Sequence, residues 1–537
     1  DTQSVCNDSD NGFGLLFNWN LLGDGTHTVH ARADGEVFGR ATFTVTTLGQ
    51  EFLTGVEKRA RLKDFPDTGT DLVVAWQQSL QNFVIIGAGP VEPPQYAAPV
   101  RVTGPLGRDE DGEAFAPNQA SAASGDINGD GHEDVVFSLW AGDITAPKAT
   151  PSPIVILLND GAGSLVDKTA TLIVGPIPEV FLVRQFIIED FNGDGQNDIF
   201  MDNHGREDTF DGEQNRLLLS EPDGRLRDVT ARNLPQVSDF SHGSSAADVD
   251  GDGDIDVWVN NVTRAPSYLM LNDGSGAFSI VADIWLDFGD RESIIGTNGR
   301  FPDALIGSQL LWTHFIDAEN DGDADLYIGL IEAFENLDGS RSNRTGILLN
   351  DGTGRFTLSN AAAIPPSPIA IDGIWRTQDS IRTDLNQDGL HDLLLYQSDQ
   401  MFRGHFVQVL ISNGDGSFRD ETSLRLPTQV RAFQGIGWPG FWFRDINGDG
   451  QNEILNFHYG PDGQPSTDVI DSYLNMGNGV FTPLPDDFVN VSPIVAAVDV
   501  NGDGWVDFID AKYGFNQLGV LEAELFLTTA INPNNPP

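Results

Sequence analysis

The stretch that decides the fold is Asp126-Ile-Asn-Gly-Asp-Gly-His-Glu-Asp134, because the same nine-residue pattern returns six more times along the chain. The other copies begin at Asp190, Asp248, Asp317, Asp384, Asp445 and Asp499. Successive copies start 54 to 69 residues apart, which leaves room for about four short strands in each repeat. Self-similarity at such a period indicates a repeat architecture in which each repeat is one supersecondary unit.

A second pattern follows the acidic one and marks a tight turn. Its clearest copies are Leu157-Leu-Asn-Asp-Gly-Ala-Gly-Ser-Leu165, Leu271-Asn-Asp-Gly-Ser-Gly-Ala-Phe278 and Leu348-Leu-Asn-Asp-Gly-Thr-Gly-Arg-Phe356. Asn-Asp-Gly between apolar runs is typical of a β-hairpin, because these residues tolerate positive φ. Each repeat therefore predicts four antiparallel strands, and seven such repeats predict an all-β fold with a seven-bladed β-propeller.

The two ends of the repeat region predict how the ring closes. Only one clear strand, Ala523 to Thr529, follows the seventh acidic segment, so the last blade lacks a strand that Val100-Arg-Val-Thr103 can supply. Residues 1–88 carry no acidic repeat, but their period-2 alternation predicts a small immunoglobulin-like β-sandwich. We expect 89–99 to be a linker, 100–530 the propeller and 531–537 a Pro/Asn-rich tail.

The acidic segments have the composition of a site for a hard cation. Positions 1 and 5 are Asp in every copy, position 3 is Asn, Asp or Glu, and position 9 is Asp or Glu. All four offer side-chain oxygen, which suits Ca²⁺, and the number of protein oxygens disfavours Mg²⁺. Position 6 is always Gly, as a sharp bend requires, and position 7 varies freely, as expected if it supplies only its carbonyl.

We therefore predict about seven Ca²⁺ ions, one per blade, held by positions 1, 3, 5, 7 and 9 of each loop. The predicted ligands are Asp126, Asn128, Asp130, His132, Asp134, Asp190, Asn192, Asp194, Gln196, Asp198, Asp248, Asp250, Asp252, Asp254, Asp256, Asp317, Glu319, Asp321, Asp323, Asp325, Asp384, Asn386, Asp388, Leu390, Asp392, Asp445, Asn447, Asp449, Gln451, Glu453, Asp499, Asn501, Asp503, Trp505 and Asp507. Empty loops would gather like charges within a few ångströms, so we expect the blades to need their ions.

Composition argues against several classes of partner. The formal charge of −50, from 80 acidic and 30 basic residues, disfavours nucleic acid and anionic membranes. Cys6 is the only cysteine, so an internal disulfide is impossible, and pairing with another chain or with a segment outside this sequence both stay open. No run of 18 apolar residues occurs, and we expect no membrane span. The start at Asp1, without a signal peptide, suggests a processed or truncated product.

The acidic segments resemble FG-GAP/VCBS repeats, which occur in integrin α-chain propellers and in many bacterial surface and secreted proteins. The resemblance covers about residues 98 to 530. It implies a seven-bladed propeller with calcium between the first two strands of a blade, an extracellular or cell-surface location, and roles in adhesion, ligand recognition or carbohydrate binding. The fourth loop departs from the pattern, with Glu319 at position 3 and Asn320 where Gly is usual, and this implies an altered site.

The segments before the acidic loops are expected to line the central channel. Candidate ligand-binding residues there are Arg184, His242, Arg376, Trp438 and Trp442, unless these side chains only pack between strands. No nucleophile elbow, zinc-ligand His pair or phosphate loop occurs, which favours a role other than catalysis.

We expect an extracellular binding, adhesion or structural protein, with self-assembly into a surface array or filament through edge strands of the sandwich as one form of that role. A calcium-dependent lectin or a polysaccharide-active, lyase-like propeller is the alternative. Whether the partner is a protein, a glycan or a second copy stays open.

Overall fold

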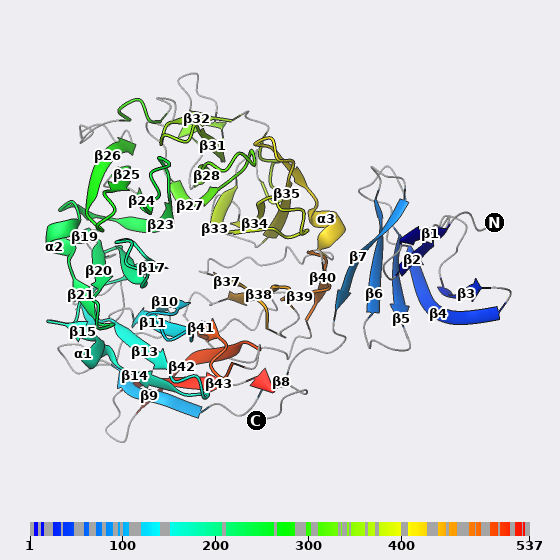
Figure 1. Ribbon diagram of the computed structural model, residues 1–537, viewed down its shortest axis with the longest axis horizontal. Helices are drawn as coiled ribbons and strands as arrows, with labels where there is room; N and C mark the ends of the chain where they lie inside the picture. The colour runs from blue at the N-terminus through cyan, green and yellow to red at the C-terminus, as the bar shows by residue number, and fades with distance from the viewer. Residues whose placement is uncertain are drawn as a thin grey trace.

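A computed structural model describes the backbone of most predicted strands. The described residues are 5–8, 12–15, 25–33, 36–47, 58–63, 71–77, 82–89, 95–96, 100–106, 120–139, 151–206, 211–261, 266–284, 297–301, 310–330, 334–335, 341–342, 345–359, 363–370, 375–398, 406–426, 439–446, 450–458, 472–477, 479–484, 494–502, 505–515, 521–528 and 530–531. Apart from three one-turn helices, the regular elements among them are all β-strands (Figure 1), so the prediction of an all-β propeller is confirmed.

Six of the repeats each form a four-stranded antiparallel sheet, or blade. In chain order these blades are β10 (Ala120–Gly125), β11 (Asp134–Leu139), β13 (Val155–Asn159) and β14 (Leu165–Asp167); β23 (Ser241–Ala247), β24 (Asp256–Asn261), β25 (Ser267–Asn272) and β26 (Phe278–Ile284); β27 (Leu310–Ile316), β28 (Asp325–Leu330), β31 (Gly346–Asn350) and β32 (Phe356–Leu358); β33 (Arg376–Thr383), β34 (Asp392–Ser398), β35 (Phe406–Ser412) and β36 (Phe418–Asp420); β37 (Pro439–Arg444), β38 (Glu453–His458), β39 (Tyr473–Asn475) and β40 (Phe481–Pro483); β41 (Ile494–Val498), β42 (Asp507–Phe515), β43 (Leu521–Thr528) and β9 (Val100–Leu106).

The described residues form six four-stranded blades and not the seven blades that the sequence predicted, because the second repeat forms a five-stranded sheet instead. Its own strands are β17 (Val183–Glu189), β18 (Asp198–Asn203), β20 (Arg216–Ser220) and β21 (Leu226–Asp228). The fifth strand, β15 (Ile173–Val174), comes from the end of the first repeat and pairs in parallel with β21. The chain leaving the first repeat thus runs along the outer edge of the next sheet and ties the two together.

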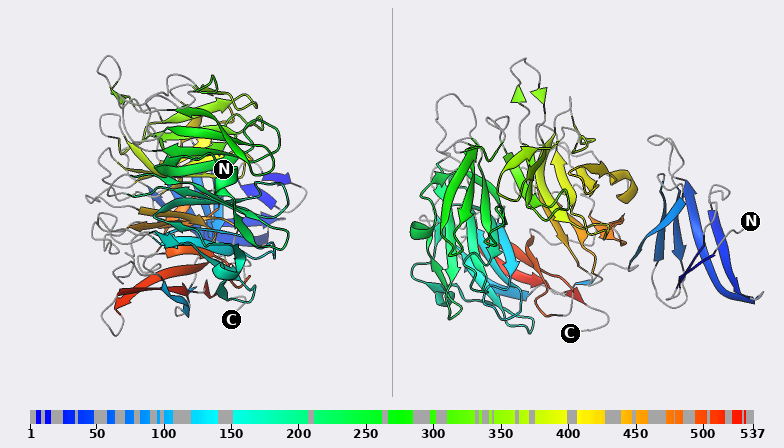
Figure 2. Two further views of the ribbon diagram at one scale, coloured as in Figure 1. Left: turned by 90° about the vertical axis from the view of Figure 1, so that its left-hand side faces the viewer. Right: turned by 45° about the horizontal axis from the view of Figure 1, so that its top comes forward.

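The last sheet takes a strand from each end of the repeat region. β9 pairs antiparallel with β43, with Arg101 opposite Phe526 and Thr103 opposite Leu525. This confirms that Val100–Thr103 completes the final blade. Figures 1 and 2 show the sheets standing side by side around a centre, and neighbouring first strands contact one another, as β10 does with both β17 and β41.

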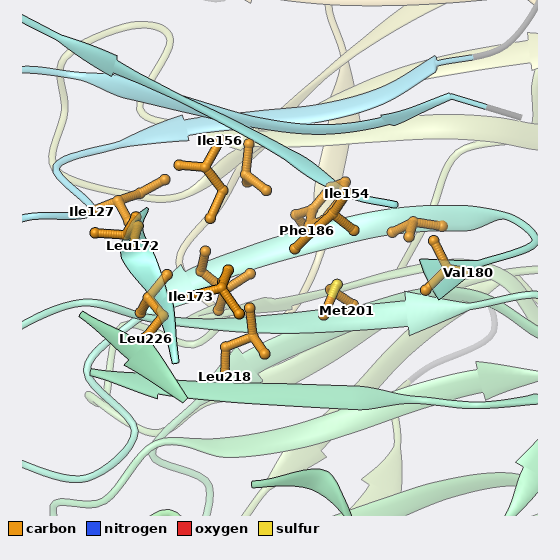
Figure 3. Close-up of a cluster of buried hydrophobic side chains, with 13 residues drawn as sticks. Ile127, Ile154, Ile156, Leu172, Ile173, Val180, Phe186, Met201, Leu218 and Leu226 are labelled. Carbon is orange, nitrogen blue, oxygen red and sulfur yellow. The ribbon is translucent and has the colours of Figure 1, made fainter. Parts of the chain in front are cut away.

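Hydrophobic cores fill the spaces between consecutive sheets. Figure 3 shows one of them, in which Ile156 of the first repeat packs with Phe186, Met201 and Leu218 of the second. A similar cluster joins the last sheet to the first, with Val498 and Ile509 packed on residues of β11 and β13. Second strands such as β18 and β24 are buried along their whole length, because a sheet covered on both faces leaves its inner strands no side open to solvent.

Three one-turn helices follow the fourth strands of their repeats: α1 (Thr169–Leu172), α2 (Thr230–Asn233) and α3 (Thr422–Arg425). Each begins at the Thr of an Asp-x-Thr triplet. In the first, Asp167 Oδ1 accepts a hydrogen bond from the Thr169 amide at 3.0 Å, and Thr169 Oγ1 accepts one from Ile156 N at 2.8 Å. The side chain of the Thr therefore anchors the helix to the third strand. This recurring triplet was visible in the sequence and was missed.

Small two-stranded sheets lie in the connections between these strands. They are β12 (Ser152–Pro153) with β16 (Glu179–Val180), β19 (Glu213–Gln214) with β22 (Ser238–Asp239), β29 (Phe334–Glu335) with β30 (Arg341–Ser342), and β8 (Gln95–Tyr96) with β44 (Ala530–Ile531). The last pair joins a strand within the segment expected to be a linker to Ala530 and Ile531, at the boundary between the expected propeller and the tail.

The N-terminal residues form a five-stranded antiparallel sheet in meander order and a separate hairpin. The sheet contains β3 (Gly25–Ala33), β4 (Glu36–Thr47), β5 (Lys58–Lys63), β6 (Asp71–Gln77) and β7 (Asn82–Gly89), and the hairpin contains β1 (Val5–Asp8) and β2 (Gly12–Leu15). The strands expected from period-2 alternation are therefore present. The immunoglobulin-like sandwich stays a prediction.

Candidate functional site

The acidic loops, numbered 1 to 7 in chain order, connect the first and second strands of their sheets. Loops 1 to 5 are described in full, whereas Asn447 and Asp449 of loop 6 and Asp503 of loop 7 lie outside the described residues. Position 9 is the first residue of the second strand in every repeat, as Asp134 is of β11. Because each first strand runs into its loop, the loops gather at one end of the sheets, which we call the loop face.

The carboxylate at position 1 organises each loop from within. In loop 1, Asp126 Oδ2 accepts a hydrogen bond from Gly131 N at 2.9 Å and Oδ1 accepts one from Asp130 N at 3.0 Å. The bond from the position 6 amide recurs in loops 2 to 6 at 2.7 to 3.0 Å. The backbone therefore wraps around the position 1 carboxylate, as the predicted site requires.

Side-chain oxygens at positions 3 and 5 are also turned into the loop. In loop 1, Asn128 Oδ1 accepts a hydrogen bond from Asp130 N, and Asp130 Oδ1 accepts one from His132 N. Loops 2 and 5 repeat both bonds, and loops 3 and 4 repeat the second. Position 7 thus contributes its backbone N–H to the loop in all five loops, which agrees with the variety of side chains found at this position.

Position 9 is buried and joins the loop to the third strand. In loop 1, Asp134 Oδ2 accepts a hydrogen bond from Ile127 N at 3.0 Å, and Oδ1 accepts one from Asn159 N at 2.8 Å. The same two bonds are made by Asp198, Asp256, Asp325, Asp392 and Glu453. Burial raises the pKa of Asp134 to about 6 and that of Asp256 to about 7. A cation held close by would favour their ionised form.

Loop 3 brings three carboxylates closest together. One oxygen from each of Asp248, Asp250 and Asp256 lies within 4.8 Å of the others. Asp250 Oδ1 is buried without a hydrogen-bond partner, and burial followed by repulsion from Asp252 raises the pKa of Asp250. A buried oxygen that lacks a donor, next to two more carboxylates, fits a hard cation, so the residues of this loop are compatible with the predicted ion.

Two backbone positions adopt the left-handed conformation in each of loops 1 to 5, one more than the sequence analysis identified. Position 6 has a positive φ, for example +88° at Gly131. Position 4 does too, and there loop 4 carries Asn320 (+56°) and loop 5 carries Gln387 (+60°) in place of Gly. The unusual Asn320 is therefore a residue that tolerates this conformation, whereas Gln387 is under steric strain.

The residue that ends the third strand holds neighbouring loops together, and sequence analysis missed this role. Asn272 Nδ2 donates to Phe191 O of loop 2 at 2.7 Å and to Ile255 O of loop 3 at 3.1 Å. Asn350 likewise donates to Val249 O of loop 3 and Ala324 O of loop 4. The signal was the Asn of the Asn-Asp-Gly turns, which we had interpreted only as a turn former.

A second polar cluster lies at the end of the second and third sheets opposite the loop face. Arg184 is the second residue of β17, His204 follows the end of β18, and His242 is the second residue of β23. Arg184 Nη2 lies 3.2 Å from His204 Nε2, which in turn lies 2.8 Å from His242 Nε2. Because a guanidinium can only donate, His204 Nε2 is the acceptor and His242 Nε2 carries a proton.

Burial sets the charge of this cluster. It lowers the pKa of His204 and of His242 well below the usual value, and the Arg184 charge acts in the same direction. Burial also raises the pKa of Asp202 to about 8 and that of Asp239 to about 6. At neutral pH both histidines are therefore neutral and Asp202 is largely protonated.

The structure places four of the five candidate ligand-binding residues. Arg184 and His242 meet through His204, but Arg376 begins β33 in the fifth repeat. Trp442 is partly buried against the core that contains Leu455 and Phe508, which is a packing role. Trp438 lies outside the described residues.

Comparison with known families identifies the repeats. A family model described as FG-GAP-like repeat matches residues 126–201, 190–259 and 384–456. Each matched stretch begins at position 1 of an acidic loop and ends in the second strand of the next repeat, so together they include loops 1, 2, 3, 5 and 6. With the observed sheets, these matches support an FG-GAP β-propeller. No curated protein matches the chain.

Solved structures with similar folds include a protein of unknown function from Dyadobacter fermentans DSM 18053, with 12% identity, a TM-score of 0.35 and coverage of 82% of this chain and 100% of that one. The Dos1 propeller has 11% identity, a TM-score of 0.35 and coverage of 78% and 94%. Scores this low do not indicate a shared function. In the described residues no helix is long and apolar enough to cross a membrane.

Proposed function

We propose that this chain is a calcium-stabilised propeller that acts outside the cell in binding or adhesion. The FG-GAP-like propeller fold suggests a binding or structural role. The observation that carries the calcium part is the convergence of Asp248, Asp250 and Asp256 in loop 3, where one buried oxygen lacks a hydrogen-bond donor. The loops with the same internal bonds would hold Ca²⁺ through positions 1, 3, 5, 7 and 9.

Calcium would act here as a structural cross-link. The position 9 carboxylate already bonds both the start of its loop and the third strand, so an ion on that carboxylate would fix the first three strands of a blade to one point. Position 5 is exposed in loops 1 to 5, which permits exchange with solvent calcium. With the Kd of about 10⁻⁴ to 10⁻³ M that is typical of extracellular modules, the loops would fill only where calcium is abundant, as it is outside the cell.

We further propose that the five-stranded sheet of the second repeat takes a blade position, which would give the ring seven blades. Hydrophobic cores on both sides of that sheet support this assignment, since one joins it to the first repeat and one to the third. The N-terminal sheet would offer a route to self-assembly. Its strands β3 and β7 are the edges of an open five-stranded sheet, and an edge strand can pair with the edge strand of a second copy.

A calcium-dependent lectin is the second candidate, favoured by the Arg184–His204–His242 cluster. Arg184 is half-buried next to the neutral His204, which in turn contacts the neutral His242, and a guanidinium placed in this way can recognise a sugar carboxylate or hydroxyls. Glycan-array binding that is lost in Arg184→Ala, while the calcium content stays unchanged, would favour this candidate over adhesion through the N-terminal sheet.

Metal content and thermal unfolding test the calcium proposal. We expect several bound Ca²⁺ per chain by elemental analysis and a transition that moves to lower temperature in chelator but is not restored by Mg²⁺. Each site at 100 times its Kd adds about 2.7 kcal/mol. Asp194→Ala at exposed position 5 should lose one ion, whereas Gln196→Ala at position 7 of the same loop should lose none. Equal unfolding temperatures with Ca²⁺ and with chelator would refute the proposal.

A further inference from the structure

Neighbouring loops share hydrogen bonds through single side chains. Asn350 ends the third strand of the fourth repeat and is almost fully buried. Its Nδ2 donates to Val249 O, at position 2 of loop 3, at 2.8 Å and to Ala324 O, at position 8 of loop 4, at 3.2 Å. Its own amide N donates to Asp325, at position 9 of loop 4, at 2.7 Å. One residue thus touches the backbone of one loop and the buried carboxylate of the next.

Asn272 makes the same three bonds one repeat earlier. Its Nδ2 reaches Phe191 O of loop 2 and Ile255 O of loop 3, and its backbone N donates to Asp256 at 2.8 Å. Loop 3 is therefore connected on both sides, to loop 2 through Asn272 and to loop 4 through Asn350.

Other neighbouring loops are linked by different groups. Asn197 Nδ2 of loop 2 donates to Asp126 O of loop 1 at 2.8 Å. Between loops 4 and 5, where Ser412 replaces the Asn, Asp317 N donates to His391 Nδ1 at 3.1 Å. The turn of the fifth repeat adds a backbone bond from Gly416 N to Ala318 O at 3.0 Å. The connection between loops is therefore preserved although the donor changes.

These bonds end on groups that an ion would order. Val249 carries the carbonyl that Asn350 binds, and its own N–H donates to Asp256, the position 9 carboxylate of loop 3. An ion on loop 3 would fix Asp256, then Val249, and through Asn350 the Ala324 carbonyl and the Asp325 carboxylate of loop 4. Loop 4 would then already be partly ordered, and the binding of its own ion would cost less conformational entropy. That ion would therefore bind more tightly.

We propose that calcium binding is positively cooperative between adjacent loops and that Asn272 and Asn350 carry the coupling at loop 3. The inference rests on the calcium proposal above. Coupling is reciprocal, so loop 4 raises the affinity of loop 3 by the same factor. Preorganising one buried hydrogen-bonded group corresponds to a factor of roughly two to ten in affinity.

The test follows each loop separately by hydrogen-exchange mass spectrometry of the full chain across a calcium titration. Asp252→Ala removes an exposed position 5 ligand and disables loop 3 without touching Asn272 or Asn350. The midpoint of calcium-dependent protection should rise about two- to tenfold at loops 2 and 4. It should rise much less at loops 1 and 5, which are not adjacent to loop 3 and are affected only through loops 2 and 4.

The substitution Asn350→Asp then isolates the coupling residue. It keeps the acceptor that Gly354 N uses but removes the donor to both carbonyls. In this background Asp252→Ala should no longer shift loop 4, while the shift at loop 2, carried by Asn272, should persist. Asn475→Asp is the matched control, because the Asn475 amide bonds Asn452 O of its own loop. Asn350→Ser, the residue found at positions 220 and 412, replaces Asn350→Asp if that variant does not fold.

The outcomes separate the two proposals. Absence of calcium-dependent protection at every loop would refute the calcium proposal itself. Protection at every loop with no shift at loops 2 and 4 in Asp252→Ala would show independent sites and overturn the coupling. An equal shift at all loops would also overturn it, because it would mark a global loss of stability.

Discussion

Replacing Gln387 by Gly should stabilise loop 5. Gln387 is at position 4 of the loop, where φ is +60°, and its side chain is exposed. Gly occupies the same position with similar φ in loops 1, 2 and 3, and no atom lies within 4 Å of where a Cβ would stand on Gly129. The side chain of Gln387 therefore contributes little packing, and the substitution acts through the backbone alone.

The expected gain follows from two opposing terms. A residue with a Cβ in the left-handed region costs about 1 to 2 kcal/mol. Gly loses more conformational entropy on folding, a cost of about 0.5 to 1 kcal/mol. The net stabilisation of loop 5 should be roughly 0.5 to 1 kcal/mol, or about a two- to fivefold slower local opening. Asn320→Gly in loop 4 should give less, because Asn tolerates this conformation.

Native-state hydrogen exchange of the Gly389 amide measures this local opening, since that amide donates to Asp384 Oδ2 at 3.0 Å within the loop. A local measurement is needed because the opening of a single loop can occur without global unfolding of the chain. Gln387→Ala is the control and should leave the exchange rate unchanged, because it keeps both the Cβ and the φ. If Gln387→Gly exchanges as fast as Gln387→Ala, or faster, the strain argument is wrong.

Two further predictions concern packing and pH. An added Cβ on Gly479 would overlap the Leu385 side chain of the neighbouring repeat, whereas an added Cβ on Gly131 would meet nothing within 4 Å. Gly479→Ala should therefore lower stability by about 1 to 3 kcal/mol more than Gly131→Ala does, as measured by thermal unfolding. Equal losses in the two variants would contradict this prediction. His242 is buried with a lowered pKa, so the unfolded chain binds a proton below pH 6.5 that the folded chain does not. In excess calcium, the free energy of unfolding should therefore fall by about 1.4 kcal/mol per pH unit through this residue as the pH is lowered from about 6.5 to 5. Urea titrations at several pH values measure this slope, and the slope should be smaller in His242→Gln.

The sequence predicted what is encoded within one repeat. Strand, acidic loop and turn follow from local chemistry: period-2 apolar residues, a Gly that accepts positive φ, and Asn-Asp-Gly between apolar runs. Ring closure by Val100–Thr103 was also predictable, because the strand count at the end of the chain was one short.

Features that depend on contacts between repeats were not predictable from one repeat. The acid at position 9 was assigned as a ligand like the others, but the structure buries it and gives it two backbone donors, one from the third strand. The role of Asn350 requires knowing that the turn of one repeat lies beside the loop of the previous one. Likewise β15 joins the second sheet only because the folded chain brings it to the edge of β21.

The positions of the two polar regions constrain how calcium could influence a ligand. The loops lie at the ends of the first strands, whereas Arg184 and His242 lie at the starts of β17 and β23. An ion in loop 2 is therefore separated from Arg184 by the length of β17 and would not bridge to a ligand bound there. Calcium would act on such a ligand through the rigidity of the sheets, since β17 enters loop 2 directly and β18 leaves it at Asp198. A ligand that needs calcium is thus no evidence for a calcium-bridged contact in this fold.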